Sequence, residues 1–417
     1  MKALKSVAVA SLFVLTPLAT LATLGSAHAS IASGASAGSV VSFPTTPAEN
    51  ARLRKNVDFW VSIYSQYDTT QGVIHDAKYI DHVYEVIKVR PGAVKESKRH
   101  WTNVLLSLHQ KNKAILKGEK VSMTPDERRI YDKFADIDEP DKFLEAAHRK
   151  RLRFQLGQKD RFIEGLRYSG RYLPLMEETF RKAGMPVELT RLPFVESGFN
   201  IHARSKVGAS GIWQFMRSTG KLFLEVDEAV DERNDPVRAT EAATKLLKLN
   251  YDSLKNWGLA VTAYNHGRKG MMRAVRMVGS DQIEDLVDRY RSRSFGFASS
   301  NFFTCLLAAI EVERNSYKYF GQIERDPPLR FYEVRIPDYI SLPKLTKFMH
   351  LELKTMKELN PAISEAVLRG ELRLPKGYRL RLPRTTPDGK MPVGAEERIF
   401  LAGYSEIPGI YKFQTQR

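Results

Sequence analysis

The sequence contains a single cysteine, Cys305, among its 417 residues. One thiol cannot close an internal disulfide, and it cannot supply the several sulfur ligands of a metal cluster. Because Cys305 lies in the apolar stretch NFFTCLLAAI, we expect it to be buried in a core. No cysteine stands near the N-terminal apolar segment, so a lipid-anchored form is not predicted, and neither is a metal or cofactor.

Acidic residues are also few, with 48 Asp and Glu against 65 Lys and Arg, a formal net charge of +17. This excess favours acidic partners such as nucleic acid, anionic lipid or an anionic wall polymer, although a charge excess also serves simply to solvate a surface. The overall mixture of 43% hydrophobic and 27% charged residues is that of a globular protein with a sizeable core.

The first 29 residues narrow the choice of partner. They carry two early lysines, then a long apolar stretch, and they end in Ala-His-Ala. This pattern is typical of a secretory signal peptide cleaved after Ala29, with an uncleaved membrane anchor as the alternative. Export makes nucleic acid a poor candidate, so a wall polymer or a membrane surface becomes the predicted partner of a monomer.

The remainder of the chain divides by composition and periodicity. Residues 30–47 are rich in Ser, Ala and Gly and read as a linker. Residues 48–153 have a mainly helical pattern, in which the alternating stretch 69–89 is compatible with a short hairpin. Residues 154–325 are densely helical. There, Asp235 and Pro236 suit the cap and first position of a helix that buries Ala239, Ala242, Ala243, Leu246 and Leu247.

The helical pattern stops near residue 326. The order strand, one or two short helices, strand then predicts a small domain over 329–385, and the tail 386–417 shows no strong periodicity. The predicted fold class is therefore mainly α within α+β.

Three stretches of the helical region carry candidate chemistry. VESGFN contains a carboxylate, Glu196, beside Ser197, and SKVGASGIWQF combines glycines that permit tight turns with the amide of Gln214. TAYNHG places the Tyr264 hydroxyl next to the Asn265 amide. Taken singly, each has an ordinary explanation, namely a solvated helical glutamate, a turn and a capped helix end.

Together, the order and spacing of these stretches resemble the lytic transglycosylases with a soluble-lytic-transglycosylase, goose-lysozyme-like domain. Their Glu-Ser motif matches Glu196 and Ser197, their Gly-Leu-Met-Gln motif matches 211–214, and their Ala-Tyr-Asn motif matches 263–265. The sequence around these stretches, together with SFGFASSNFF, is similar to the membrane-bound lytic murein transglycosylase D subgroup. Residues 329–385 resemble a degenerate LysM module, in which the usual Gly-Asp-Thr is replaced by 336–339 and carbohydrate binding is uncertain.

The resemblance implies a lysozyme-like domain that cleaves the β-1,4 bond between N-acetylmuramic acid and N-acetylglucosamine and leaves 1,6-anhydro ends. It implies that Glu196 acts as general acid and then base, with Tyr264 and Ser205 beside it. The implied substrate-binding residues are Gln214, Asn265, Ser197, Gly211, Gly208 and Trp213. For Ser197 a purely structural hydrogen bond is the alternative, and for Trp213 a place in the core.

Cleavage of a glycosidic bond requires an acid that is still protonated when it meets the leaving oxygen, and therefore an acid with a raised pKa. Burial among apolar neighbours, such as those of Glu196 in the sequence, raises the pKa of a carboxyl group. No second carboxylate occurs in the three stretches, and we assign the acids of 227–235 to the start of the following helix. A single acid fits the non-hydrolytic reaction that the resemblance implies. A hydrolytic lysozyme on the same scaffold and a non-catalytic wall-binding protein are the alternatives.

Overall fold

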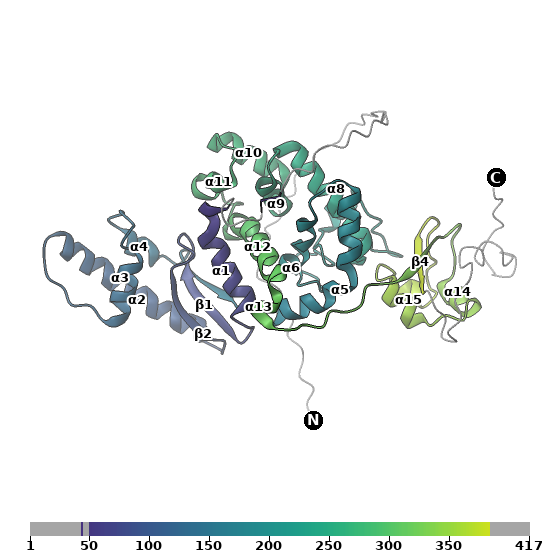
Figure 1. The fold of residues 1–417 in the computed structure, drawn as a ribbon, viewed down its shortest axis with the longest axis horizontal. Coiled ribbons are helices and arrows are strands. Elements are labelled where there is room, and N and C mark those ends of the chain that lie inside the picture. Colours follow the sequence, from purple (N-terminus) through teal and green to yellow (C-terminus); the bar gives the residue numbers. More distant parts are fainter. Residues whose placement is uncertain (1–42, 45–49, 384–417) are drawn as a thin grey trace, which may run out of the picture. The chain divides into compact units, whose positions relative to one another are not determined.

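The computed structural model describes residues 43–44 and 50–383 (Figure 1). The predicted signal peptide, most of the predicted linker and the predicted tail lie outside these residues. The described chain is dominated by helices with two small sheets, which confirms the predicted fold class. It forms two compact units that are each discontinuous in sequence. We call them the Tyr264 unit (Ser42–Leu166 with Asn250–Glu324) and the Glu196 unit (167–249 with 325–383).

A three-stranded antiparallel sheet lies in the Tyr264 unit. β1 (Gln71–Asp76) pairs with β2 (Val83–Lys88), which confirms the predicted hairpin, and β3 (Leu152–Leu156) pairs with the other edge of β1. The pairing of β3 was not predicted, because its partner lies about 80 residues earlier in the chain. Asp76 at the end of β1 is buried and receives two bonds of 2.8 Å from the Arg151 guanidinium, which fixes this junction.

Three helices share an apolar cluster with this sheet. Figure 1 shows these helices beside β1 and β2. They are α2 (Ala93–Leu116), α3 (Pro125–Lys133) and α4 (Lys142–Ala146). α3 begins with a capping box, in which the Thr124 hydroxyl accepts from the Glu127 amide and the Glu127 carboxylate accepts from the Thr124 amide.

A largely buried helix, α12 (Phe297–Arg314), forms the centre of the Tyr264 unit. Cys305 on this helix is fully buried, as predicted. α1 (Arg54–Ser65) packs along α12, and the Trp60 indole donates to the Asn301 amide oxygen at 3.2 Å. The remaining elements of this unit are η1 (Ala51–Leu53), α9 (Trp257–His266), α10 (Arg268–Val278), α11 (Ile283–Arg289) and α13 (Ser316–Phe320).

The Glu196 unit begins within α5 (Lys159–Lys182) and ends its first part within α8 (Pro236–Leu254). Between them lie η2 (Val187–Arg191), α6 (Leu192–Glu196), α7 (Arg217–Gly220) and η3 (Glu232–Asn234). The start of α8 confirms the predicted cap, because the Asp235 carboxylate accepts from the amides of Val237 and Arg238 at 2.9 and 3.1 Å. The predicted apolar face of α8 is buried, with Leu246 half-buried at its margin.

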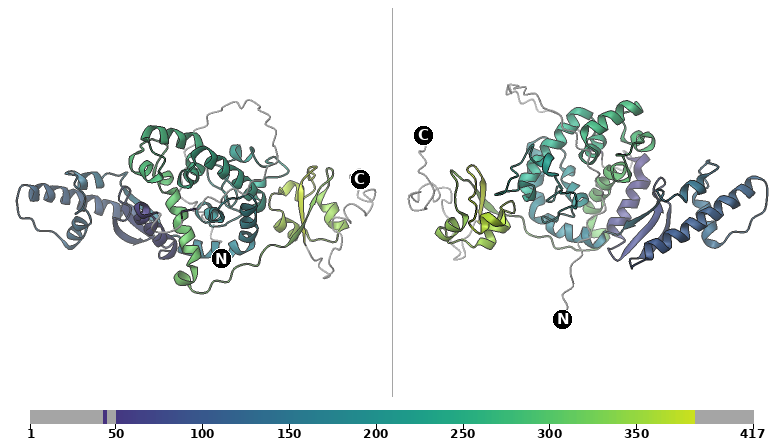
Figure 2. Two further views of the ribbon diagram at one scale, coloured as in Figure 1. Left: turned by 45° about the horizontal axis from the view of Figure 1, so that its top comes forward. Right: turned by 180° about the vertical axis from the view of Figure 1, so that it is seen from behind.

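The C-terminal module, residues 331–383, contains the predicted strand, helix, helix, strand order. Its strands β4 (Phe331–Arg335) and β5 (Arg379–Pro383) are antiparallel and flanked by α14 (Leu342–Phe348) and α15 (Leu353–Leu359). A third short helix, α16 (Glu365–Leu368), was not predicted. Figure 2 shows this module in yellow-green, with the strand pair beside its short helices. Within the described chain, no helix is both long and apolar enough to cross a membrane.

Candidate active site

Glu196 stands at the last position of a short helix, where the backbone turns sharply. The 3₁₀ helix η2 ends at Arg191 and α6 begins at Leu192, with Pro193 in the first turn of α6. Beyond Glu196, the amides of Ser197 and Phe199 both donate to the Pro193 carbonyl, at 3.0 and 3.2 Å. This turn ends α6 directly after the acid, so Glu196 does not lie along a regular helix face.

The turn after Glu196 includes a strained residue that the core holds in place. Phe199 has a φ of 58°, a left-handed conformation that costs a non-glycine residue about 1–2 kcal/mol. Its ring is fully buried and meets Phe194 edge-to-face, with 4.6 Å between the ring centroids. Packing of these two rings therefore offsets the backbone strain and fixes the position of the acid between them.

Burial raises the pKa of Glu196 to about 8. The residue as a whole is half-buried, but the neighbouring side chains of Phe194, Val195 and Phe199 are buried, and desolvation of the carboxyl disfavours its charged form. Across residues 50–383, no ion pair or hydrogen bond to this carboxyl offsets that cost. Glu196 is thus protonated at neutral pH, which is the state that a general acid requires.

The loop 203–215, which we call the glycine loop, contains a tight turn closed by Ser205. The Ser205 amide donates to the Ala209 carbonyl, and the Ala209 amide donates to the Ser205 hydroxyl oxygen, both at 2.9 Å. Gly208 allows the turn with a φ of 90°. Since the Ser205 oxygen accepts here, its hydroxyl hydrogen is left to donate to another group.

Gly211 is required by a close backbone approach. Its φ is 76°, and a Cβ at this position would lie 1.8 Å from the Arg233 carbonyl oxygen. Gln214, with a φ of 48°, donates its amide nitrogen to the carbonyls of Ala203 and Gly211 at 3.2 and 2.8 Å. The Gln214 nitrogen therefore holds the glycine loop in shape, and only the amide oxygen is left to face a ligand.

Ser197 links the acid to the glycine loop. Its hydroxyl donates to the Ile212 carbonyl at 2.9 Å and lies 3.3 Å from the Pro193 carbonyl. This bond joins the residue after Glu196 to the middle of the loop, so it supports the structural alternative for Ser197.

Trp213 belongs to the core. Its ring is fully buried and stacks on Phe180 with 6.0 Å between centroids, and its indole nitrogen donates to the Thr240 hydroxyl at 2.9 Å. A fully buried ring has no face left for a sugar. The alternative in which Trp213 stacks on the glycan is therefore not carried into the proposal below.

Replacing Trp213 with Phe is expected to lower the free energy of unfolding by about 2 kcal/mol, because the change loses buried volume and the bond to Thr240. Urea unfolding followed by circular dichroism measures the loss. Unchanged stability combined with weaker sedimentation with wall sacculi would instead support a sugar contact for this ring.

Sequence analysis did not identify two residues outside the glycine loop that hold it in place, Arg233 and Asn234. The Arg233 guanidinium donates to the carbonyls of Gly208 and Phe215 at 2.9 and 3.2 Å, and Asn234 accepts from the Ser210 hydroxyl at 2.6 Å. The sequence signal that could have indicated Arg233 is a lone arginine within the acidic stretch 227–235. The sequence does not show that this side chain is buried or where it points.

Tyr264 and Asn265 lie in the last turn of α9, a helix of the Tyr264 unit. Gly267, with a φ of 88°, caps the end of this helix. The Asn265 amide oxygen accepts from the Ser299 hydroxyl on α12 at 2.8 Å, and the Tyr264 ring lies parallel to that of Phe302, 6.4 Å away. Both residues are half-buried, so α12 orients the pair while leaving part of each exposed. Ser299 lies in the stretch SFGFASSNFF, but its bond to Asn265 was not predicted.

The part of the chain that carries these residues is similar to known proteins. Residues 175–287 match the family model described as the transglycosylase SLT domain, and this range includes Glu196, the glycine loop, Tyr264 and Asn265. The chain is 28% identical over 198 residues to the membrane-bound lytic murein transglycosylase D of Escherichia coli K12, and equally to that of an O6:H1 strain. These alignments cover 45% of this chain and 42% of each relative.

A third similar protein is a putative tributyltin chloride resistance protein of an Alteromonas species. It is 31% identical over 106 residues, which are 25% of this chain and 51% of that protein. The aligned part of the chain thus spans about half or less of the length of each of these relatives.

Proposed function

Because residues 175–287 match the transglycosylase SLT domain, we propose that this protein is a peptidoglycan lytic transglycosylase. It cleaves the β-1,4 bond between N-acetylmuramic acid and N-acetylglucosamine and leaves 1,6-anhydromuramic ends. The observation that carries the proposal is Glu196, a carboxyl placed at an abrupt helix end inside the matched domain, with a pKa raised by burial to about 8.

The reaction uses this one carboxyl twice. Protonated Glu196 donates its proton to the oxygen that joins the two sugars, and the bond from that oxygen to C1 of the muramic acid breaks. The N-acetyl oxygen of the same muramic acid stabilises the cationic C1. The Glu196 carboxylate then takes the proton of the C6 hydroxyl as its oxygen bonds to C1, so the acid is regenerated and no water is consumed.

The neighbouring acids have structural tasks that support a single-acid mechanism. Asp231 pairs with Arg233 at 2.7 Å, and Asp235 caps α8 and pairs with Arg381 at 2.8 Å. Glycosidases with two working carboxylates keep the second one near the scissile bond and free to act. The assignment of these acids to the start of α8 therefore holds for Asp235, while Asp231 serves the glycine loop through Arg233.

The other residues take supporting roles in the proposal. The Ser205 hydroxyl hydrogen-bonds near the acid, and the Gln214 amide oxygen positions the sugar. The motif resemblance assigns Tyr264 and Asn265 to the glycan as well. Ser299 supports this role of Asn265 by the bond to its amide oxygen. Gly208 and Gly211 let the backbone of the loop approach the glycan.

Mass analysis of digested, purified peptidoglycan tests the proposal. We expect muropeptides lighter by one water than their hydrolysed counterparts, because the C6 hydroxyl replaces water as the nucleophile. Reducing ends alone would identify a hydrolytic lysozyme. Intact glycan, together with sedimentation of the protein with sacculi, would identify a non-catalytic wall-binding protein.

The rate of cleavage is expected to fall as the pH rises through about 8. The pKa of Glu196 is raised from its ordinary value, so the acid form persists at neutral pH and is lost above the raised pKa. The expected decline is about tenfold for each pH unit beyond that point. Initial rates of sacculus solubilisation between pH 5 and pH 10 measure it. A rate that still rises above pH 9 would rule out Glu196 as the proton donor.

We propose that the protein acts in the cell envelope after export to the periplasm. The signal-peptide pattern of residues 1–29 and the net charge of +17 support this location, since peptidoglycan carries carboxylates on its stem peptides.

A further inference from the structure

One face of α8 and the strands of the C-terminal module are complementary in charge. Asp235, Arg238 and Glu241, at the start of α8, are three residues apart and lie on one face of the helix. The strands β4 and β5 carry a side chain of opposite charge at each of the three contacts. In the strand pair, Glu333 lies directly opposite Arg381. The ion pairs are Asp235 with Arg381, Arg238 with Glu333, and Glu241 with Arg379.

The pair of Asp235 and Arg381 is the buried centre of this contact. Both side chains are almost fully buried, and the guanidinium meets the two carboxylate oxygens at 2.8 and 2.9 Å. Arg381 also donates to the Leu359 carbonyl at 3.1 Å. A buried charge without its partner is strongly destabilising, so each of these two residues requires the other to stay in place.

The segment 229–231, just before α8, is built into the module as well. The Ser364 amide donates to the Ala229 carbonyl at 2.9 Å, and the Asp231 amide donates to the Ala362 carbonyl at 2.8 Å. The Val230 side chain between them belongs to the apolar core of the module. The module is therefore packed against the start of α8 through backbone, apolar and charged contacts at once.

The same short segment holds the glycine loop on its other side. Arg233 and Asn234 lie two and three residues after Asp231, and they bind the carbonyls of Gly208 and Phe215 and the hydroxyl of Ser210. The short 3₁₀ helix η3, residues 232–234, lies between the module contact at Asp231 and the one at Asp235. A displacement of the segment relative to the module would thus displace the groups that shape the loop.

We infer that the C-terminal module positions the glycine loop for catalysis, with Arg381 and Asp235 as positioning residues. This inference rests on the proposed function, in which the loop serves the glycan. The module holds the segment 229–235 in place, and this segment holds the glycine loop of the same unit. This role does not depend on glycan binding by the module.

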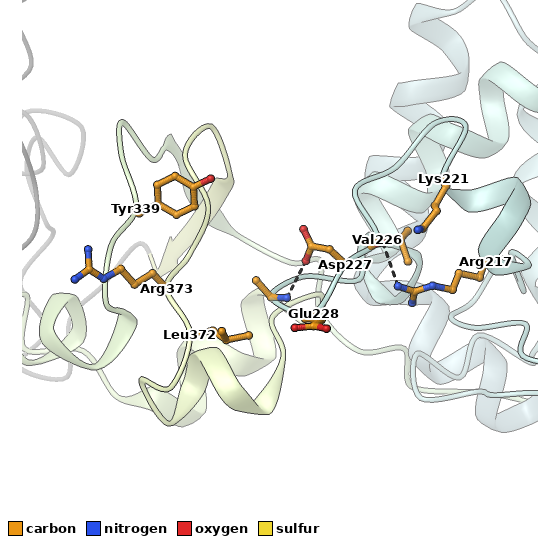
Figure 3. A pocket seen from close by; sticks show the side chains of 9 residues that line it. Arg217, Lys221, Val226, Asp227, Glu228, Tyr339, Leu372 and Arg373 are labelled. Atoms are coloured by element: carbon orange, nitrogen blue, oxygen red, sulfur yellow. Dashed lines mark hydrogen bonds between the residues drawn. The ribbon is translucent and has the colours of Figure 1, made fainter.

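A cavity of about 620 Å³ at this junction supplies a control position. Figure 3 shows Tyr339 and Arg373 of the module on one side, and Arg217 and Lys221 on the other. Arg373 is exposed, and within the described chain no ion pair involves it. Replacing Arg373 with Ala therefore removes a charge at the junction without touching the buried contact.

The test compares the full-length chain with the double variant Asp235→Asn plus Arg381→Met and with Arg373→Ala. Asparagine still caps α8, and removing both charges leaves neither one buried alone. We expect faster hydrogen exchange at the Ser210 and Gly211 amides, which bond to Phe215 and Ala203. We also expect a fall in kcat of about tenfold for the double variant only.

Two results would overturn the inference: unchanged exchange at these amides, or unchanged kcat in a folded double variant. If the double variant does not fold, Arg381→Lys is judged by the same two readouts, because lysine keeps the positive charge beside Asp235 but loses the two-pronged guanidinium contact. Anhydro products from the unaltered chain report on the proposed function separately, and the exchange measurement does not depend on activity.

Discussion

Replacing Glu196 with Gln is expected to reduce peptidoglycan cleavage about a thousandfold or more. The amide keeps the size of the side chain but cannot donate a proton to the glycosidic oxygen or take one from the C6 hydroxyl. Both proton transfers are lost at once, because the proposed mechanism assigns them to the same carboxyl. Release of soluble anhydro-muropeptides from sacculi, followed by mass analysis, measures the effect.

The same variant is expected to be more stable than the parent protein at alkaline pH. The pKa of Glu196 is raised to about 8 in the folded state against an ordinary value of 4.5, so the folded state binds more protons than the unfolded state between these values. Stability of the parent therefore falls as the pH rises through this window, and glutamine removes that loss. We expect a gain on the order of 4 kcal/mol at pH 8.

Thermal unfolding at pH 4 and pH 8 measures this gain, which should be small at the lower pH. Sedimentation with sacculi should be retained and serves as the control for glycan binding. Full residual lysis by the folded variant would refute the assignment of Glu196 as the acid, whatever its effect on stability.

Replacing Gly211 with Ala is expected to cost about 3 kcal/mol or more of unfolding free energy and to lower activity about a hundredfold. A Cβ would lie 1.8 Å from the Arg233 carbonyl oxygen, and backbone atoms cannot swing aside as a side chain does. The loop must then move away from the segment that holds it, which displaces Gln214 and the backbone expected to meet the glycan. Urea unfolding and initial cleavage rates measure the two effects.

Gly279 offers a matched control at the end of α10. Its φ of 70° is close to the 76° of Gly211, but a Cβ there would meet nothing within 4 Å. Replacing Gly279 with Ala should thus show the cost of the left-handed backbone alone, about 1 kcal/mol, with activity preserved. Equal losses for the two variants would mean that the contact with Arg233 does not constrain the loop.

The sequence by itself determined the features that depend on neighbouring residues. The Asp235 cap and Pro236 start of α8, the hairpin of β1 and β2, and all but the third helix of the C-terminal module were predicted. Each follows from local periodicity or from side chains that bond to their own backbone within a few positions. The three short stretches likewise named the matched domain, since their order and spacing are properties of the sequence.

Only the tertiary structure decided the features that depend on long-range contact. Local pattern did not choose between core and sugar for Trp213, because an apolar ring suits both environments. Arg381 and Asp235 are 146 residues apart, and nothing in either local sequence indicates that burial makes each the partner of the other. The raised pKa of Glu196 also depends on the tertiary structure. The sequence supplies the carboxyl and its apolar neighbours, but the desolvation of the carboxyl depends on how densely the folded chain surrounds it.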